Sequence, residues 1–394
     1  MKKEKLVPEI RFKGFEEEWV KFKLGDIGIF NSNGVDKVYR EKDNVVHMVN
    51  YMDVYNKVEI TSNNINRFMI TTANNSELIN NNLIKGDILF TPSSETIDDI
   101  GHTFVVQETI PNLVYSYHLV RFRPNSEEFY ETFANYCLDQ KRLCDQYMLR
   151  AQGVQRFVLN REHFNSLSVI KPSILEQKKI NKFLFSLDSY INSQKLKLKK
   201  LNEVKQSLLN KMFASENQKF PEIRFKGFEE EWKNILMNDI IFSLPYKKYV
   251  KSPSIGGSFP VIQQGAEPIC GLANGYPFAD YNNVVIFGDH TLSIYKPKCP
   301  FFVASDGIRI LKSKNDLPAE FLYRIIEKHL PLSHGYTRHF SILKMQEVKI
   351  SITYNEQQKI GQFFSNLDSL IQSQELKLEK LNNIKQALLE KMFC

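Results

Sequence analysis

The sequence predicts an α+β fold in which two mixed α/β domains are joined and separated by two long coiled-coil helices. Three observations in the 394 residues lead to this prediction. A twelve-residue segment occurs twice without change, and a long heptad pattern also occurs twice. The stretches between these repeats alternate short β-rich runs with helical patterns. Because both repeats keep the same order in the two halves, we expect a pseudo-twofold internal repeat.

The first repeat is the segment PEIRFKGFEEEW, which stands at 8–19 and again at 221–232. The second repeat pairs residues 176–213 with 356–393, where 24 of the 38 aligned positions are identical. The offset is 213 residues for the first repeat and 180 for the second. The stretch between the repeated segments is therefore 156 residues long in the first half and 123 in the second. We call the repeated segments of each half its frame and the stretch between them its insert. The two frames are nearly identical, whereas the two inserts differ.

Both copies of the second repeat predict a long helix with a coiled-coil seam. Apolar residues recur at alternating spacings of four and three over about five heptads, and Gln and Lys interrupt both seams at matching places. Ser173-x-x-Glu176 and Thr353-x-x-Glu356 both fit a capping box at the helix start. The central seam positions are Leu184, Leu187, Ile191, Gln194, Leu198 and Leu201 in the first helix, and Phe364, Leu367, Ile371, Gln374, Leu378 and Leu381 in the second.

An apolar stripe of this length needs another apolar surface to cover it. Either the two helices pair with each other, or each lies on its own domain. The matching polar positions in the two seams favour pairing of the helices. If Gln194 faces Gln374, the two buried amides satisfy each other, whereas an amide facing leucine costs about 1–3 kcal/mol. The helices differ in charge, since 176–213 carries nine Lys against three acids and 356–393 carries five of each. The lysine excess fits either a solvated face or a position near phosphates.

The inserts predict mixed α/β domains. Runs rich in β-formers, separated by Gly, Pro and Asn, predict strands, whereas 127–149 and 319–329 have helical patterns. The Asn-rich stretch 62–82 predicts a loop. The runs that predict strands are 45–49, 87–91, 103–107 and 119–122 in the first insert, and 261–263, 284–287, 301–304 and 308–311 in the second.

Near the end of each insert the two halves become similar again, with GVQRF at 153–157 and GYTRHF at 335–340. Glycine permits a tight turn, and arginine beside glutamine or threonine supplies side chains that read base edges or clamp phosphates. The alternative is a surface loop whose arginine pairs with a carboxylate. The candidate DNA-binding residues are Arg150, Gln152, Gln155, Arg156, Lys247, Lys248, Lys251, Tyr336, Thr337 and Arg338.

The composition and the missing motifs narrow the class of protein. A formal net charge of +7 permits a polyanionic partner without proving one. Five scattered cysteines form no C-x-x-C pair, and no signal peptide or membrane span follows Met1. The sequence has no P-loop, no H-E-x-x-H, no G-x-S-x-G and no glycine-rich dinucleotide loop. We therefore expect a cytoplasmic recognition or scaffold protein without catalytic activity, cofactor or metal of its own.

The ordered set of segments resembles the specificity subunit of type I restriction–modification systems along the whole chain. The resemblance rests on PEIRFKGFxxxW, on Glu176-Gln177-x-Lys179-Ile180, on helices that close with Lys-Met-Phe, and on the twofold order of variable insert and long helix. It implies two target-recognition domains, each reading half of a bipartite double-stranded DNA site, and two helices that pack antiparallel as a spacer. The implied boundaries are 1–172 and 215–352 for the target-recognition domains, and 173–214 and 353–394 for the spacer helices.

The resemblance also implies partners. Two methyltransferase subunits would dock on the helices, bind S-adenosylmethionine and methylate adenine, while restriction subunits with motor activity would use ATP and Mg²⁺; no membrane is involved. The alternatives are an enzyme, which the missing motifs disfavour, and a coiled-coil scaffold or stand-alone DNA-binding protein without a restriction–modification role. Because the inserts differ in length by 33 residues, the halves are not expected to be structurally equivalent outside the frame.

Overall fold

The computed structural model divides into two compact units. Unit 1 comprises Met1–Asn192 together with Glu379–Cys394, and unit 2 comprises Ser193–Leu378. Each unit therefore contains one insert and part of both long helices. The structure describes residues 6–215, 217–333, 335 and 337–394.

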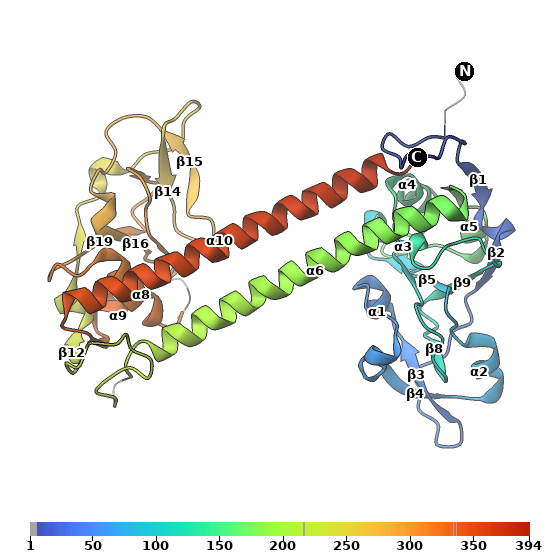
Figure 1. The fold of residues 1–394 in the computed structure, drawn as a ribbon, viewed down its shortest axis with the longest axis horizontal. Helices are drawn as coiled ribbons and strands as arrows, with labels where there is room; N and C mark the ends of the chain where they lie inside the picture. The colour runs from blue at the N-terminus through green and yellow to red at the C-terminus, as the bar shows by residue number, and fades with distance from the viewer. Residues whose placement is uncertain (1–5, 216, 334, 336) are drawn as a thin grey trace. The chain divides into compact units, whose positions relative to one another are not determined.

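The two long helices are α6 (Ile174–Lys211) and α10 (Tyr354–Lys391), each of 38 residues (Figure 1). Each begins two residues before the repeated segment and ends two residues before its last phenylalanine, which confirms the helices that the heptad pattern predicts. In unit 1, the first turns of α6 pack with the last turns of α10, whereas in unit 2 the last turns of α6 pack with the first turns of α10. The helices are therefore antiparallel.

Unit 1 builds its insert on two sheets. A four-stranded antiparallel sheet has the order β2-β9-β5-β7. A three-stranded sheet has the order β4-β3-β8, in which β3 runs antiparallel to β4 and parallel to β8. Two short antiparallel pairs, β1-β11 and β6-β10, complete the unit. The strands are β1 (Val20–Lys23), β2 (Gly28–Asn31), β3 (Asn44–Val49), β4 (Met69–Ala73), β5 (Ile88–Phe90), β6 (Ser93–Ser94), β7 (Thr103–Val105), β8 (Leu113–Tyr115), β9 (Val120–Pro124), β10 (Phe157–Val158) and β11 (Ser168–Lys171). The short helices are α1 (Tyr51–Tyr55), α2 (Asn75–Asn81), α3 (Phe133–Cys137), α4 (Lys141–Arg150) and α5 (Arg161–Asn165).

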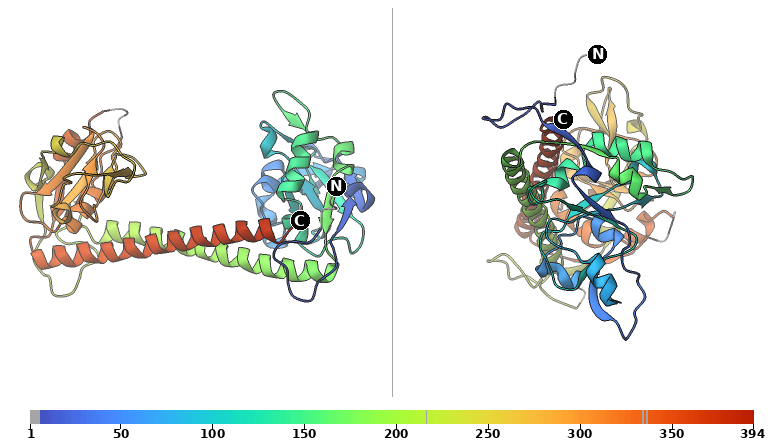
Figure 2. Two further views of the ribbon diagram at one scale, coloured as in Figure 1. Left: turned by 90° about the horizontal axis from the view of Figure 1, so that it is seen from above. Right: turned by 90° about the vertical axis from the view of Figure 1, so that its right-hand side faces the viewer.

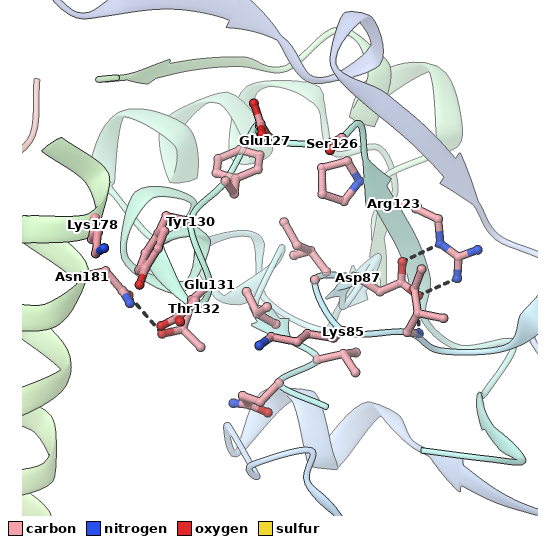
Figure 3. A pocket seen from close by; sticks show the side chains of 18 of the residues that line it. Lys85, Asp87, Arg123, Ser126, Glu127, Tyr130, Glu131, Thr132, Lys178 and Asn181 are labelled. Atoms are coloured by element: carbon pink, nitrogen blue, oxygen red, sulfur yellow. Dashed lines mark hydrogen bonds and ion pairs between the residues drawn. The ribbon is translucent and has the colours of Figure 1, made fainter. Parts of the chain in front are cut away.

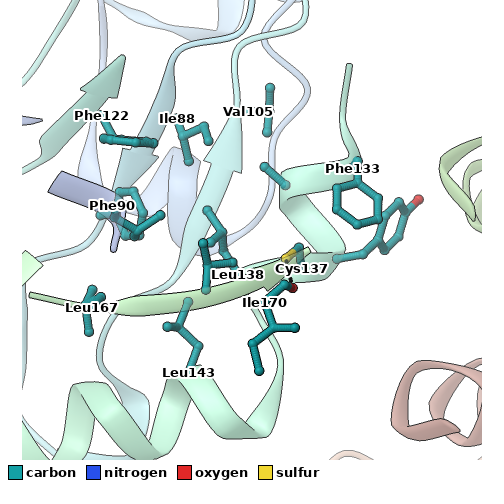
Figure 4. Close-up of a cluster of buried hydrophobic side chains, with 14 of the residues drawn as sticks. Ile88, Phe90, Val105, Phe122, Phe133, Cys137, Leu138, Leu143, Leu167 and Ile170 are labelled. Atoms are coloured by element: carbon teal, nitrogen blue, oxygen red, sulfur yellow. Dashed lines mark hydrogen bonds between the residues drawn. The ribbon is translucent and has the colours of Figure 1, made fainter. Parts of the chain in front are cut away.

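Strand β5 is buried on both faces and holds the two sheets of unit 1 together. Its alternate residues Ile88 and Phe90 join a cluster that includes Phe122 and Phe133 (Figure 4). Leu89 points the other way, into a second cluster with residues of the three-stranded sheet. Successive side chains of a strand point to opposite faces of the sheet, so a strand that is covered on both faces contributes alternate residues to two different clusters.

The four-stranded and three-stranded sheets of unit 2 have the same strand order as those of unit 1, although the insert of unit 2 is shorter. Its four-stranded antiparallel sheet is β13-β19-β16-β17, its three-stranded sheet is β15-β14-β18 with one antiparallel and one parallel pair, and its frame pair is β12-β20. Figure 2 shows these strands on one side of α6 and α10. The strands are β12 (Lys233–Leu236), β13 (Ile241–Leu244), β14 (Phe259–Ile262), β15 (Ile269–Ala273), β16 (Val284–Gly288), β17 (Ile294–Tyr295), β18 (Phe302–Val303), β19 (Ile308–Ser313) and β20 (Glu347–Ile350). The short helices are α7 (Met237–Ile240), α8 (Ala319–Lys328) and α9 (Phe340–Lys344).

The four-stranded and the three-stranded sheets have the same strand order in the two units, a likeness that the sequences of the inserts do not show. As expected from the difference in insert length, the halves are not fully equivalent outside the frame, since the β6-β10 pair of unit 1 has no counterpart among the strands described in unit 2. Two local expectations are wrong. The stretch 62–82 contains β4 and α2 instead of a loop, because β4 pairs with β3 and Asn74 caps α2 through Glu77. The expected helix 127–149 begins only at α3 and is interrupted before α4, and its first residues form a loop.

The two sequence repeats bind each other through a buried ion pair. Arg11 of the first twelve-residue segment donates two hydrogen bonds to the Glu176 carboxylate, both at 2.8 Å, and Arg224 does the same to Glu356 at 2.6 and 2.9 Å. Both glutamates are buried and need a cationic partner. Their carboxylates are therefore taken by arginine, which differs from the capping box expected from the sequence. This pairing explains why the two repeats occur together although their offsets differ.

The seam is set in register by polar contacts. In unit 2, Gln374 Nε2 donates to Gln194 Oε1 at 3.0 Å, as expected for facing amides. Lys205 lies 2.8 Å from Asp368 in unit 2, and Lys385 lies 2.5 Å from Asp188 in unit 1. The seam lysines thus meet aspartates at equivalent positions of the other helix. Of the seam residues, Leu184, Ile191, Gln194, Phe364, Ile371 and Gln374 are buried, whereas Leu187, Leu198, Leu201, Leu367, Leu378 and Leu381 are half-buried.

Candidate nucleic-acid interface

In unit 1, the segment 153–157 is a tight loop closed by backbone hydrogen bonds between Gln152 and Val158 at 3.1 and 2.8 Å. Gly153 has φ +136°, and a Cβ at this position would lie 1.9 Å from the Arg156 carbonyl oxygen, so only glycine fits the turn. The Arg156 Nε donates to Ser93 Oγ at 3.2 Å, while Gln152, Val154 and Gln155 are exposed. The loop therefore presents its polar side chains to solvent beside strand β6.

Tyr117 and His118 are exposed residues between β8 and β9. Loss of hydration, together with the positive charges of Lys37 and of Arg156 on the loop, lowers the pKa of His118. The rings of Tyr117 and His118 contact each other with their centroids 3.9 Å apart. Positive charge and aromatic faces thus occur together in this part of unit 1, which is a combination suited to nucleic acid.

In unit 2, the loop that carries Thr337 and Arg338 is anchored through the buried His339. The His339 ring Nδ1 lies 3.1 Å from the Asp289 carbonyl oxygen, and the Phe340 backbone N donates to Asp289 Oδ1 at 2.8 Å. Asp289 is buried and forms an ion pair with Arg309 at 3.0 Å. The Arg338 side chain is exposed, and among the described residues the structure records no hydrogen bond or ion pair from its guanidinium.

The two loops occupy equivalent places in their units. The backbone N of Leu159 donates to the carbonyl oxygen of Pro92, two residues after β5, at 2.8 Å. The backbone N of His339 donates to the carbonyl oxygen of Asp289, directly after β16, at 2.9 Å. Strands β5 and β16 hold the same place in the two four-stranded sheets. The two loops therefore share a place in the fold, although Arg156 stands five residues before α5 and Arg338 only two residues before α9.

Of the other candidate residues, Arg150 and Lys251 have structural partners within their own unit. The Arg150 guanidinium donates to Ser166 Oγ at 3.0 Å and to the Gln146 carbonyl oxygen at 3.1 Å. Lys251 donates to the Asn274 carbonyl oxygen and lies over the Phe302 ring. Lys247 and Lys248 are exposed on a 3-10 helix, and Lys248 lies over the Tyr249 ring. Tyr336 lies outside the described residues.

Sequence reasoning missed four residues near the loops, which are Lys37, Tyr117, His118 and His290. The ring Nδ1 of His290 lies 3.2 Å from the Thr337 carbonyl oxygen, and its backbone N donates to Gln264 Oε1 at 3.2 Å. These side chains lie far from the loops along the chain and have no characteristic spacing. For Tyr117, His118 and His290, the position directly after or between predicted strands was the only available signal.

We expect Arg338→Ala to weaken DNA binding to a similar degree for all sequences, with a shallower dependence of log affinity on log salt concentration. The reason is that an arginine found in the loops of two inserts with otherwise different sequences is better placed to hold phosphate than to select a base. The measurement is DNA affinity of the complex at several salt concentrations, with base changes in each half-site. Relaxed base choice confined to one half-site would mean that Arg338 reads a base edge, contrary to this expectation.

Comparison with known proteins identifies the family. The family model described as the type I restriction modification DNA specificity domain matches this sequence twice, at residues 16–206 and at residues 229–383. A protein of Methanocaldococcus jannaschii assigned as the MjaX type I restriction enzyme specificity subunit is 24% identical over 406 residues, covering 95% of this chain and 92% of that protein.

Solved structures share the fold. The crystal structure of the type I restriction–modification S subunit from M. genitalium matches with a TM-score of 0.63 at 15% identity, covering 98% of this chain and 99% of that one. A second structure, which concerns complex assembly and conformational transition of the type I restriction–modification system, matches with a TM-score of 0.52 at 16% identity, covering 95% and 97%. Within the described residues, no helix has the length and apolar character needed to cross a membrane. Since the family model matches most of the sequence in two successive segments, the chain belongs to the type I restriction–modification DNA specificity family.

Proposed function

We propose that the chain reads a bipartite double-stranded DNA site within a type I restriction–modification complex, with one insert for each half-site. The observation that carries this proposal is the placement of the two arginine loops at the same position of two sheets with the same strand order. Their shared arginines suit phosphate contacts. Their differing neighbours, Gln155 against Thr337, suit different base contacts.

We also propose that the long helices dock two methyltransferase subunits through a stripe of residues on each helix. In α6 the stripe consists of the residues that line a shallow groove of about 350 Å³. Its apolar residues Leu196 and Val204 are 53% and 48% exposed and lie eight residues apart on the same helix. The residues that line the groove are Ser193, Leu196, Lys197, Lys200, Leu201 and Val204.

The internal repeat supports a docking role for this stripe. The corresponding positions of α10 hold Ser373, Leu376, Lys377, Lys380, Leu381 and Ile384, so five of six are identical and the sixth exchanges Val for Ile. Exposed neighbours outside the stripe differ, since Lys195 and Lys199 correspond to Glu375 and Glu379. A face that stays the same while its surroundings change fits two copies of one partner.

We expect Leu196→Glu with Val204→Glu to remove one methyltransferase subunit from the complex. Placing charge in an apolar contact leaves it buried without a partner. The same change at Leu376 and Ile384 should remove one subunit, and the combined variant both. Native mass spectrometry of the assembled complex counts the copies. The matched control exchanges Lys195 and Lys199 for glutamate, the residues of α10, and should keep two copies. A combined variant that still binds two subunits would contradict the assignment of the stripe.

Catalysis is proposed to lie on partner subunits in the cytoplasm, with S-adenosylmethionine on the methyltransferase and ATP with Mg²⁺ on the restriction subunits. The chain alone is then expected to transfer no methyl group, hydrolyse no ATP and cut no DNA. Labelled S-adenosylmethionine, labelled ATP and plasmid DNA, each incubated with the purified chain, test this. Methylated DNA or any other turnover by the chain free of partners would contradict it.

A further inference from the structure

Unit 1 contains a cavity of about 850 Å³ away from the arginine loop (Figure 3). It lies between the first turns of α6, the ends of β5 and β7, and the loop 125–132 that follows β9. Figure 3 shows Lys178 and Asn181 of α6 on one side and the Asp87–Arg123 ion pair on the other. A volume of this size suits a small organic ligand.

The loop that covers the cavity is fixed in place by α6 and β11. Gln177 is fully buried; its Oε1 accepts from the Tyr130 backbone N at 2.9 Å, and its Nε2 donates to the Glu128 carbonyl oxygen at 3.2 Å. The Glu128 carboxylate forms an ion pair with Lys171 at 2.8 Å. The Thr132 hydroxyl donates to Asn181 Oδ1 at 3.0 Å. Because these contacts hold the loop from both ends, the cavity is preformed.

The wall that α6 contributes is specific to this half of the chain. It consists of Lys178, Asn181, Lys182, Phe185 and Ser186, and the corresponding positions of α10 hold Gln358, Gly361, Gln362, Ser365 and Asn366. All five differ, although 24 of the 38 repeat positions are identical.

One of these differences has a packing reason. A Cβ at Gly361 would lie 2.9 Å from the Phe321 backbone N, because α8 packs closely there. Lys178, Lys182 and Phe185 are exposed, and the Lys178 Nζ lies over the Tyr130 ring, 5.9 Å from its centroid. These three side chains give the wall of unit 1 two cations and an aromatic ring where α10 has neutral polar groups.

The chemistry of the cavity combines apolar walls with cations. Buried Ile88, Val105 and Val106 line its interior, and Phe129, Tyr130 and Phe185 add aromatic surface. Lys85, Lys178 and Lys182 line it without a carboxylate at ion-pair distance among the described residues.

Glu127 and Glu131 also line the cavity, on the loop, and would repel an anion there. The negative group of a ligand is therefore best placed at the helix wall.

We propose that this cavity binds one small aromatic anion per chain, with its ring against Phe185 and Tyr130 and its negative group at Lys178 and Lys182. Aromatic faces and lysine ammonium groups are the partners that such a molecule needs. The site is separate from the DNA-reading loops and from the docking stripe. The α6 residues of its wall are replaced at all five corresponding positions of α10, whereas the loops and the stripe occur in both halves.

The test uses 8-anilinonaphthalene-1-sulfonate as probe and the full chain, with calorimetry and fluorescence as readouts. We expect one site per chain. Lys178→Gln with Lys182→Gln introduces the residues that α10 carries on its surface, so the helix tolerates them, and should weaken binding about tenfold or more. Phe185→Ser should also weaken it. The uncharged N-phenyl-1-naphthylamine should bind about tenfold more weakly than the sulfonate.

The matched control is Lys195→Gln with Lys199→Gln, which removes the same charge from exposed positions of the same helix. This control should bind the sulfonate like the unchanged chain. Equal weakening by both double variants would show a general effect of charge and overturn the proposal. Equal affinity for the charged and uncharged probes, or several equivalent sites, would overturn it as well.

Discussion

Replacing residues 20–172 with the insert of another family member is expected to change one half of the methylated sequence and to leave the other half as it was. Contacts to base edges are local, and a mismatched base costs about 1–3 kcal/mol at its own position. The replaced segment contains the loop at Arg156 and its neighbours Lys37 and His118. It leaves the frame pair Arg11–Glu176 intact, because both partners lie outside it.

The measurement is sequencing of methylated adenines in cells that carry the exchanged chain with its partner subunits. Replacement of 233–352 is the reciprocal experiment and should change the other half-site only. The spacing between the half-sites should stay constant in both, because α6 and α10 are unchanged. A change in both halves after one replacement would mean that the inserts do not read DNA independently.

Arg324→Ala is expected to lower the free energy of unfolding of unit 2 by about 3 kcal/mol. The Arg324 side chain is buried and lies between the carboxylates of Glu327, at 2.6 Å, and Asp368. Lys205 pairs with the same two carboxylates at 2.8 Å. Without Arg324, two neighbouring carboxylates share one lysine, and a cavity is left beside Phe364.

The chain has two tryptophans, which allows unit 2 to be followed by itself. Trp19 belongs to the core of unit 1 and Trp232 to that of unit 2. In a Trp19→Phe background, fluorescence during urea unfolding reports the surroundings of Trp232. Arg338→Ala in the same background is the control and should change stability by less than about 0.5 kcal/mol, because this side chain is exposed. Equal stability of the two variants would contradict the role assigned to Arg324.

The long helices and most strands could be predicted because they depend on local patterns. The heptad pattern predicted the helices α6 and α10. The contact between Gln194 and Gln374 was predicted because the two seams have polar residues at matching positions and run antiparallel. The partners of Glu176 and Glu356 could not be predicted, since each ion pair joins segments more than a hundred residues apart. From the local sequence alone, these glutamates were expected to accept a hydrogen bond from the helix N-terminus in a capping box. In the structure each buried carboxylate binds an arginine instead, because a charge-assisted pair with two hydrogen bonds is stronger.

The errors in the inserts also have physical reasons. Asparagine in 62–82 suggested a loop, but Asn74 starts a helix there and β4 is formed by pairing with β3. In 127–149 the residues favour a helix by composition, yet Glu127 and Glu131 adopt φ of +65° and +42°, which ends helical geometry. Backbone angles of this kind are set by the contacts of Gln177 and Asn181 with the loop, which no local pattern reveals.

The candidate interface was predicted only in part. The loops at Arg156 and Arg338 stood out because two otherwise different inserts share a short pattern. Tyr117, His118 and His290 did not, because only the tertiary fold brings them to the loops. Arg150 and Lys251 were selected for their charge, and the structure gives both of them partners within their own unit.

The most direct test of the central claim is a map of methylated adenines in the host at base resolution, with and without the gene for this chain, while the partner subunits are kept. The account predicts one bipartite motif, two specific segments separated by a fixed spacer, that is methylated only when the chain is present. An unchanged methylation map would contradict the claim that this chain selects the DNA sequence.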